Sequence, residues 1–311
     1  MADKAATRDG YGNGLMKLGE SNPQVVVLDA DLWTSTRTEQ FRKTWPERFI
    51  DAGICEQDMV GVAAGLAVEG FIPFASSFAC FMSRGWEQVR VSVAIPALNV
   101  KLGATHAGIT VGDDGASAQM TEDFALMRSL PNMVVVCPCD VVEAEQATLA
   151  AAAHHGPVYL RFGRERVPTI TAPGDPFVLG QARPLREGGD VTIAATGIMV
   201  SAALEAVEAL AGDGIEAALL DFHTIKPLDQ DALLASAGRT RAVVTAEEHQ
   251  VMGGLGSAVA EVLVKHLPLP VEMVGMQDVF GESGTPAQLL RKYGQTPGDI
   301  VAAAHRAIAR K

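Results

Sequence analysis

The chain has 311 residues, of which 48% are hydrophobic and 20% are charged, so it is long enough for two ordinary domains with separate cores. Its formal net charge is −12, and no cluster of Lys and Arg interrupts that acidic balance. Nucleic acids and anionic membranes are bound through cationic surfaces, so neither is a predicted partner. The sequence shows no apolar signal segment and no apolar run near the roughly 20 residues of a membrane span. The expected location is the cytoplasm.

The four cysteines are too few and too unevenly placed for a disulfide framework in a chain of this length. Cys137 and Cys139 flank a proline at the end of an apolar run, where the two side chains of a strand point to opposite faces. No histidine or second cysteine pair lies at zinc spacing nearby. We therefore predict no metal site on this chain.

Apolar, β-branched runs alternate with longer segments of helical periodicity, a pattern typical of a parallel sheet with helices on both faces. In the first half of the chain these runs are residues 24–30, 71–76, 98–104, 133–138 and 157–162. After a break the alternation resumes, with runs at 191–197, 216–222, 241–248 and 271–276. The sequence therefore predicts two α/β domains, each built on a largely parallel sheet.

The break between the two halves, residues 163–190, is rich in proline, glycine and charged side chains. This composition is typical of a linker. We predict a first domain over 1–165, a linker over 166–188 and a second domain over 189–311.

The most informative block runs from Phe49 to Asp123. Its first segment, FIDAGICEQDMVGVAAGLAVEG, predicts a strand end, a turn and an Ala/Gly-rich helix with Glu56 in the first turn. The plain interpretation of such a glutamate is that it complements the helix macrodipole. The segments PFASSFACFMSRGWEQVR and KLGATHAGITVGDDGASAQMTED follow it, and all three resemble the transketolases and their thiamine-diphosphate-dependent relatives in order and spacing.

The resemblance assigns Glu56 as the catalytic, cofactor-activating glutamate. Such a carboxyl, bonded to N1′ of the aminopyrimidine, favours the imino tautomer, which takes the proton from the thiazolium carbon. Phe78 and Phe81 match an aromatic pair that packs on the pyrimidine ring. Two such phenylalanines on an apolar helix face are otherwise ordinary core residues. The implied cofactor is thiamine diphosphate.

The loop ATHAGITVGDDG resembles the transketolase loop whose first histidine contacts the donor sugar, which assigns His106 to catalysis and substrate binding. Asp114 matches an aspartate that binds a hydroxyl of the aldose, although aspartates in a glycine-rich loop also form turns. Ala118 stands where transketolases usually have a second histidine. This departure puts the usual pentose-phosphate substrates in doubt, but not two-carbon transfer itself.

Three positions resemble the substrate-phosphate site of the family, namely Arg8, Ser35 and Arg161. Arginine suits a phosphate because its planar fork of donors binds two oxygens at once. The DADL motif resembles a family motif whose aspartate, here Asp31, is expected near Glu56 beside the cofactor. Arg84 occupies a position that is often aromatic in transketolases, and its role stays open.

The resemblance covers almost the whole chain: about 5–165 match the pyrimidine-binding domain, and motifs of the second half match the transketolase C-terminal domain in order. In the family the C-terminal domain mainly serves assembly. Glu247, Glu248 and His249 are therefore expected to be structural or interface residues.

The pyrophosphate domain of full-length transketolases, with its Gly-Asp-Gly to Asn motif, has no counterpart in this sequence. Gly212-Asp213-Gly214 matches only the start of that motif and is expected to end a helix, while Gly253 to Gly256 are expected to form a strand-to-helix turn. We therefore expect an N-terminal transketolase subunit as partner, which supplies the diphosphate and Mg2+ ligands in an α2β2 assembly acting on sugar phosphates.

Alternatives remain at this point. The β subunit of a 2-oxoacid dehydrogenase shares the two-domain plan, and deoxyxylulose-phosphate synthase shares the glycine-rich loop. A non-catalytic scaffold or regulatory subunit is the reading from a different class. The main prediction is one subunit of a split transketolase.

Overall fold

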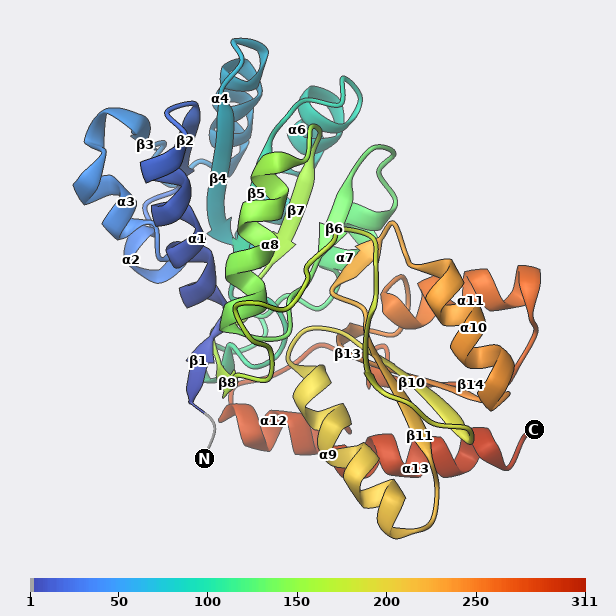
Figure 1. Cartoon of the computed structure of the whole chain (residues 1–311). Coiled ribbons are helices and arrows are strands. Elements are labelled where there is room, and N and C mark those ends of the chain that lie inside the picture. Colours follow the sequence, from blue (N-terminus) through green and yellow to red (C-terminus); the bar gives the residue numbers. More distant parts are fainter. Residues whose placement is uncertain (1–2) are drawn as a thin grey trace.

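The structure, a computed structural model, describes residues 3–311, so the first two residues of the predicted first domain lie outside it. Two α/β units, one from each half of the chain, stack on each other (Figure 1). In the described residues no helix is long and apolar enough to cross a membrane.

The first unit is a seven-stranded sheet that is parallel except for one edge. Its strands, in spatial order, are β12 (Thr224–Lys226), β6 (Val134–Val136), β7 (Val158–Arg161), β5 (Lys101–Thr105), β4 (Ile72–Phe78), β2 (Val25–Asp29) and β3 (Phe49–Asp51). The edge strand β12 comes from the second half of the chain and pairs with β6 in antiparallel fashion. The two halves therefore share one sheet.

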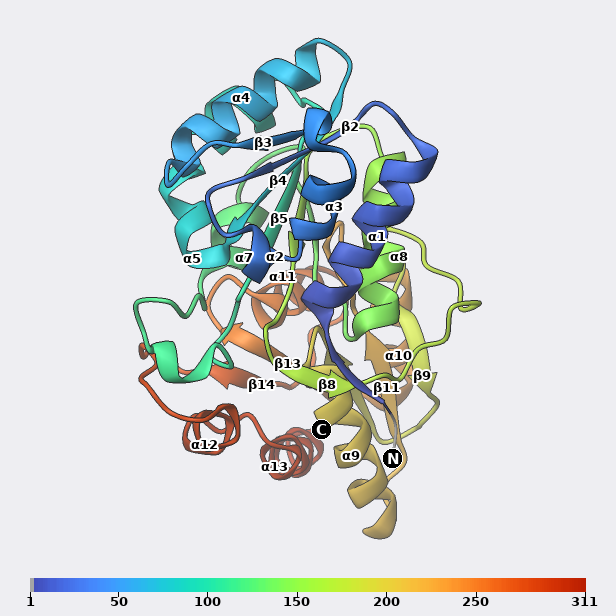
Figure 2. The same ribbon diagram turned by 90° about the vertical axis from the view of Figure 1, so that its left-hand side faces the viewer.

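Helices cover both faces of this sheet (Figure 2). One face carries α1 (Thr7–Ser21) and α8 (Val141–Ala153), and the other carries α4 (Glu56–Val68) and α7 (Asp123–Arg128). The close contact of α1 with α8 requires glycine, because a Cβ on Gly10 would lie 2.0 Å from the carbonyl oxygen of Val141. Short helices complete the connections: α2 (Trp33–Thr36), α3 (Glu39–Thr44), α5 (Ala79–Met82) and α6 (Trp86–Gln88).

The second unit is a five-stranded sheet with one antiparallel edge. Its order is β14 (Val271–Met276), β13 (Val243–Gln250), β10 (Val191–Ala195), β11 (Ala217–Asp221) and β9 (Arg183–Arg186). Helices α9 (Met199–Gly212) and α13 (Pro297–Ile308) lie on one side, while α10 (Gln230–Thr240) and α11 (Leu255–His266) lie on the other (Figure 1). Helix α12 (Pro286–Lys292) lies between α13 and the first unit.

The structure confirms the fold class, and each of the nine predicted apolar runs contains a strand of one of the two sheets. The expected turns are also confirmed, since α9 ends at Gly212 and Gly253 precedes α11. The predicted linker differs from expectation because it carries two short strands. One is β9, and the other is β8 (Arg166–Pro168), which pairs with β1 (Lys4–Ala6). Alternating polar side chains on these edge strands hide them from a search for apolar runs.

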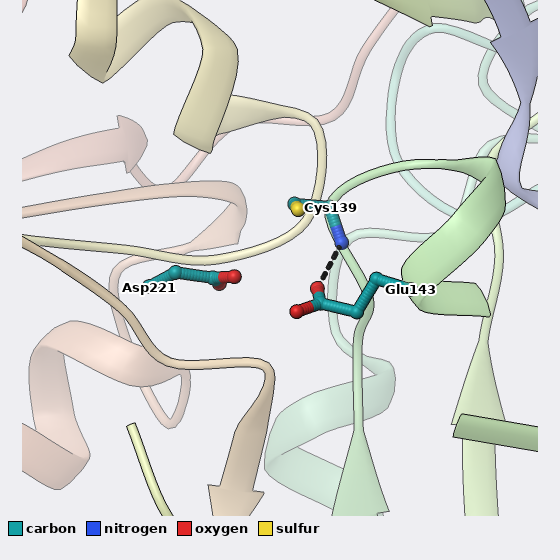
Figure 3. Close-up of side chains that lie close together, drawn as sticks. All are labelled: Cys139, Glu143 and Asp221. Atoms are coloured by element: carbon teal, nitrogen blue, oxygen red, sulfur yellow. Dashed lines mark hydrogen bonds between the residues drawn. The ribbon is translucent and has the colours of Figure 1, made fainter. Parts of the chain in front are cut away.

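A buried cluster of polar side chains joins the two units (Figure 3). Cys139 and Glu143 come from the first half of the chain, and Asp221 comes from the end of β11. Their sulfur and carboxyl oxygen atoms lie within 4.8 Å of one another. Glu143 accepts the backbone N–H of Cys139 at 2.8 Å, and Nη2 of Arg183 lies 3.2 Å from its other oxygen.

This cluster contains two carboxyl groups and one guanidinium. If both carboxyl groups were ionised, one negative charge would remain uncompensated. Both oxygens of Asp221 lack a hydrogen-bond donor within residues 3–311. Burial raises the pKa of Asp221 well above its ordinary value, and the facing carboxyl of Glu143 raises it further. The pKa of Glu143 is also raised by burial, against the effects of the Cys139 amide and Arg183. The pair therefore retains a proton in the folded chain.

We expect this pair to weaken the fold as pH rises. A carboxyl whose pKa is raised on folding binds a proton that the unfolded chain has released, so its stabilisation is complete below about pH 4 and is lost as pH rises through the folded pKa. Asp221→Asn removes one titrating group. It should flatten that pH dependence and raise the free energy of unfolding at pH 8 by about 1–3 kcal/mol.

Urea unfolding from pH 5 to 8 measures this effect, with the exposed Asp231→Asn as the matched control. A parallel series with a metal chelator should give the same curves as one without. A fall in stability caused by the chelator would instead indicate a bound metal ion and contradict the shared proton.

Candidate active site

The predicted site residues gather at one edge of the seven-stranded sheet. Strands β3, β2, β4 and β5 are neighbours and run parallel, so their carboxyl ends meet at that edge. Strand β4 ends with Phe78, and the segments that follow the other three carry Asp31, Glu56 and His106. Clefts for ligands in open α/β sheets form at such an edge.

Glu56 is the first residue of α4, and only 2% of it is exposed. Its Oε2 atom is buried and has no hydrogen-bond partner in the part of the chain that the structure describes. The nearest cation is Arg84, whose Nε lies 3.5 Å away and whose side chain is 68% exposed. A glutamate that served only the helix macrodipole would gain nothing from such burial, because a buried carboxyl without a donor is costly. The site therefore presents an unsatisfied proton acceptor.

Three flat rings stand in a row beside this edge. The rings of Phe78 and Phe81 stack with centroids 5.4 Å apart and planes 9° apart. The imidazole of His106 also stacks on Phe78, with centroids 3.7 Å apart and planes 22° apart. Both phenylalanines are partly exposed rather than buried in the core, so an aromatic ligand can still reach them.

His106 has a left-handed backbone, with φ 56°, and is 3% exposed. Nη1 of Arg8 lies 2.9 Å from its Nε2, and the hydroxyl of Thr105 lies 2.9 Å from its Nδ1. A guanidinium has no acceptor, so Nε2 must accept and carry no proton. Burial, together with the charges of Arg8, Arg164 and Arg37, lowers the pKa of His106 to about 3. The ring is therefore neutral, with its proton on Nδ1 and directed at Thr105.

Arg8 lies in the first turn of α1 and also donates from Nη1 to the backbone oxygen of Ser35 at 3.0 Å. The structure thus brings Arg8, Ser35 and His106 together. Burial lowers the pKa of Arg8, and the neighbouring charge of Arg37 adds to the effect. A group of arginines whose charges oppose each other in this way is a favourable place for an anion.

Arg161 lies apart from this group in the structure, and the substrate-binding role predicted for it stays a prediction. Its guanidinium is 5% exposed and donates to Asp123 Oδ2 at 2.8 Å and to the backbone oxygens of Met120 and Glu248. The arginine that lies at the surface is Arg164, which is 42% exposed.

Sequence reasoning missed Arg164. It donates to Asp114 Oδ2 at 2.9 Å and to the backbone oxygen of Val111 at 3.0 Å, and so brings Asp114 to the arginine group. The available signal was the second arginine, three positions after the first in the segment LRFGR. On a strand that runs into a loop, the first of these arginines belongs to the sheet and the second to the surface.

Asp31 has φ 61° and an exposed side chain, and its N–H donates to Asp51 Oδ1 at 3.2 Å. Asp51 also accepts the N–H of Gly53, so it ties the DADL turn to the segment that leads into Glu56. The aspartate that shapes the turn is Asp29, which accepts from Leu32, Thr36 and Thr38. Burial raises the pKa of Asp29 to about 6 against these hydrogen bonds.

The comparisons with known proteins agree with this geometry. Residues 3–169 match the family described as "Transketolase, pyrimidine binding domain", and residues 180–300 match "Transketolase, C-terminal domain". The chain belongs to the transketolase family.

Three relatives show which part of the family this chain resembles. The 6-deoxy-6-sulfo-D-fructose transketolase subunit SqwH of Clostridium sp. (strain MSTE9) is 47% identical over 98% of this chain and 95% of its own length. A solved split gene transketolase, described as an inactive β4 tetramer, is 53% identical with a TM-score of 0.93, and the match covers 98% of this chain and 99% of that one. Mouse transketolase is 38% identical, and the chain spans 49% of its length.

We expect His106 to stay neutral, with its proton on Nδ1, between about pH 5 and 8. Protonation would put a cation against Arg8 and remove the acceptor that Arg8 uses. Long-range proton–nitrogen NMR spectra report the tautomer directly, and the His106→Gln variant assigns the signal. A titration in this range, or a proton on Nε2, would refute the proposed hydrogen-bond chain.

Proposed function

We propose that this chain is one subunit of a split, thiamine-diphosphate-dependent transketolase. It acts in the transfer of a two-carbon ketol unit from a ketose phosphate to an aldose. The observation that supports this most strongly is the buried Oε2 of Glu56, which has no hydrogen-bond partner within residues 3–311 and lies in a site with two partly exposed phenylalanine rings. Family membership carries the coarser statement, a transferase of the transketolase type.

Glu56, Phe78 and Phe81 fit the aminopyrimidine of thiamine diphosphate. A ring nitrogen that shares a proton with Oε2 would satisfy the buried carboxyl, and the phenylalanines offer a flat apolar face for the ring. When bound there, the cofactor would supply a carbon nucleophile for the ketose carbonyl. Glu56 then acts as the group that holds and returns one proton. Nε of Arg84 lies 3.5 Å from Oε2 of Glu56, and this side chain is 68% exposed.

The sugar site lies on the other side of Phe78. We propose that Arg8 and Arg164 bind the anionic end of the sugar, with Ser35 as a neutral donor; Arg164 replaces Arg161 in this role. Neutral His106 contacts a hydroxyl of the donor sugar, which would replace Arg8 as the donor to its Nε2, and Asp114 contacts the acceptor aldose. Ala118 supplies no polar side chain, so this site leaves at least one sugar hydroxyl without a side-chain partner.

A partner subunit is proposed to cover the exposed face of α4. Its outer side carries Gly61 and Gly65, where a Cβ would meet no atom within 4 Å, so another helix can approach closely. Ile54 and Val68 beside them are 79% and 68% exposed. Such an apolar face next to an incomplete site is typical of an interface. We propose that the partner is a pyrophosphate-domain subunit that holds the diphosphate and Mg2+, in an α2β2 assembly.

Within this proposal the first domain, 1–165, carries the chemistry, and the second, 189–311, is joined to it through 166–188. Two enzyme alternatives and one non-enzyme alternative are distinguished by assay. Turnover of pyruvate by the mixed subunits would favour a 2-oxoacid dehydrogenase or a deoxyxylulose-phosphate synthase; a synthase of the latter type from Desulforudis audaxviator is 37% identical. Absence of any turnover would favour a scaffold subunit.

The Glu56→Gln variant tests the proposed role of the glutamate. Mixed with a pyrophosphate-domain subunit, thiamine diphosphate and Mg2+, it should lose about 10²–10⁴-fold in kcat/KM, because the amide cannot transfer the proton. Asp58→Asn is the matched control, since Asp58 lies in the same helical turn but is exposed. Equal, small effects of the two variants would support the helix-macrodipole interpretation instead.

Substitution of the two arginines of LRFGR should have different effects: one variant should weaken substrate binding and the other should lower the stability of the fold. Arg164→Met should raise KM for a ketose phosphate about 10–100-fold with little loss of stability, because an exposed charged donor is lost. Arg161→Met should lower the free energy of unfolding by about 3–5 kcal/mol, because Asp123 is left buried without its partner.

An unphosphorylated ketose controls for general damage, and a sulfonated ketose tests the other anion, because the relative SqwH is named for a sulfo-fructose. A larger KM effect of Arg164→Met with the unphosphorylated ketose would contradict the proposed anion contact.

A further inference from the structure

The loop that carries His106 and Asp114 is closed at its base by a backbone pair. Gly108 donates to the carbonyl of Met120 at 2.7 Å, and Met120 returns the bond at 3.4 Å. We call Gly108–Thr110 together with Met120 the loop base. His106 lies between the end of β5 and the loop base. Contacts that hold the loop base in place therefore also restrict the position of His106.

A carboxyl group from the other half of the chain lies against this loop base. Glu248 belongs to β13 of the second sheet and is 3% exposed. Its Oε1 accepts the backbone N–H of Thr110 at 2.6 Å. A carboxylate that accepts a backbone N–H at this distance makes one of the stronger kinds of hydrogen bond in proteins.

The fit between this carboxyl and the loop is close. Gly108 has φ 82°, and a Cβ there would lie 2.1 Å from the carboxyl carbon of Glu248. The loop can therefore approach Glu248 only because residue 108 is a glycine. Its conformation and the position of the carboxyl depend on each other.

Two opposing effects act on the pKa of the Glu248 carboxyl. Burial raises its pKa, whereas Arg161 and the amides of Thr110 and Ile109 lower it. Nη2 of Arg161 donates both to the backbone oxygen of Glu248 at 2.9 Å and to that of Met120 at 3.2 Å. Arg161 thus joins β13 to the loop base directly.

The C-terminal end of the loop, at Gln119, has a second contact with the second half of the chain. Gln119 is 7% exposed, and its Nε2 donates to the carbonyl of Glu282 at 2.9 Å. A Cβ on Gly281 would lie 1.8 Å from Oε1 of Gln119. Both ends of the loop are therefore held by residues of the second unit.

We propose that Glu248 is a positioning residue for the sugar site: its carboxyl fixes the loop base and thereby the placement of His106 and Asp114. The C-terminal unit then determines how the sugar is held, in addition to its role in assembly. This inference rests on the proposed function for its catalytic meaning, but the contact between Glu248 and the loop does not.

The neighbouring Glu247 is the matched control. It is equally buried, but its oxygens accept the N–H groups of Leu255 and Gly256 at the start of α11, away from the loop. Loss of either carboxyl removes a buried acceptor for backbone N–H. Only Glu248 should change the loop.

Hydrogen exchange of the isolated chain, read by NMR or mass spectrometry, tests the contact without any assay of activity. In Glu248→Leu the amides of the loop base should exchange about 10–100-fold faster, because Thr110 loses its acceptor. Glu248→Gln keeps an acceptor and should restore most of the protection. Glu247→Leu should leave loop exchange unchanged relative to the parent.

If Glu248→Leu does not fold, Gly108→Ala approaches the same contact from the loop side and should accelerate exchange at the same amides. Equal loop exchange in Glu247→Leu and Glu248→Leu would overturn the proposal.

Kinetics of the mixed subunits supply the second readout. Glu248→Leu should raise KM for the ketose about tenfold, whereas the affinity for thiamine diphosphate should stay within about twofold, because Glu56 and Phe81 lie outside the loop. A parallel rise in both constants would indicate general loosening and count against a positioning role. If the parent mixture transfers no ketol unit, the proposed function fails, and hydrogen exchange still decides the contact.

Discussion

The buried ion pair between Arg161 and Asp123 is the interaction on which the rest of the site depends. One guanidinium, 5% exposed, binds the start of α7, the carbonyl of Met120 and the backbone of β13. Such a pair is costly to bury, and it is stable here because each side has additional hydrogen bonds, including one from Tyr159 to Asp123. It fixes two sheets and one loop relative to each other.

Beside this ion pair, the site has two regions that differ in their electrostatics. Around Glu56 a carboxyl is buried with an unsatisfied oxygen, and around Arg8 several cations surround a histidine that is neutral. The phenylalanine pair lies at the boundary, where Phe78 stacks on His106. A ring that shares a proton would fit the region of Glu56, and an anionic sugar would fit the region of Arg8. In each case the ligand supplies the proton or the negative charge that the region lacks.

Much of the fold could be predicted because apolar runs of β-branched residues report buried parallel strands directly. The edge strands β9 and β12 could not, since β9 is partly exposed and carries polar residues, and β12 has only three residues. In the site, the local segments around Glu56, Phe78 and His106 were recognisable. The choice between Arg161 and Arg164 was not, because it depends on Asp123, which lies far away in sequence but next to Arg161 in space. The contact of Glu248 with Thr110 crosses 138 positions and is invisible to any local pattern.

Strand β12 has a consequence for how this protein is synthesised. Residues 224–226 complete the edge of the first sheet beside β6, so the ribosome must make the first part of the second unit, through β11, before the first sheet is closed. Until then β6 presents an open row of amide and carbonyl groups that can pair with another nascent chain. A gene division between these two units would leave that edge bare permanently. The shared sheet therefore favours keeping both units on one polypeptide.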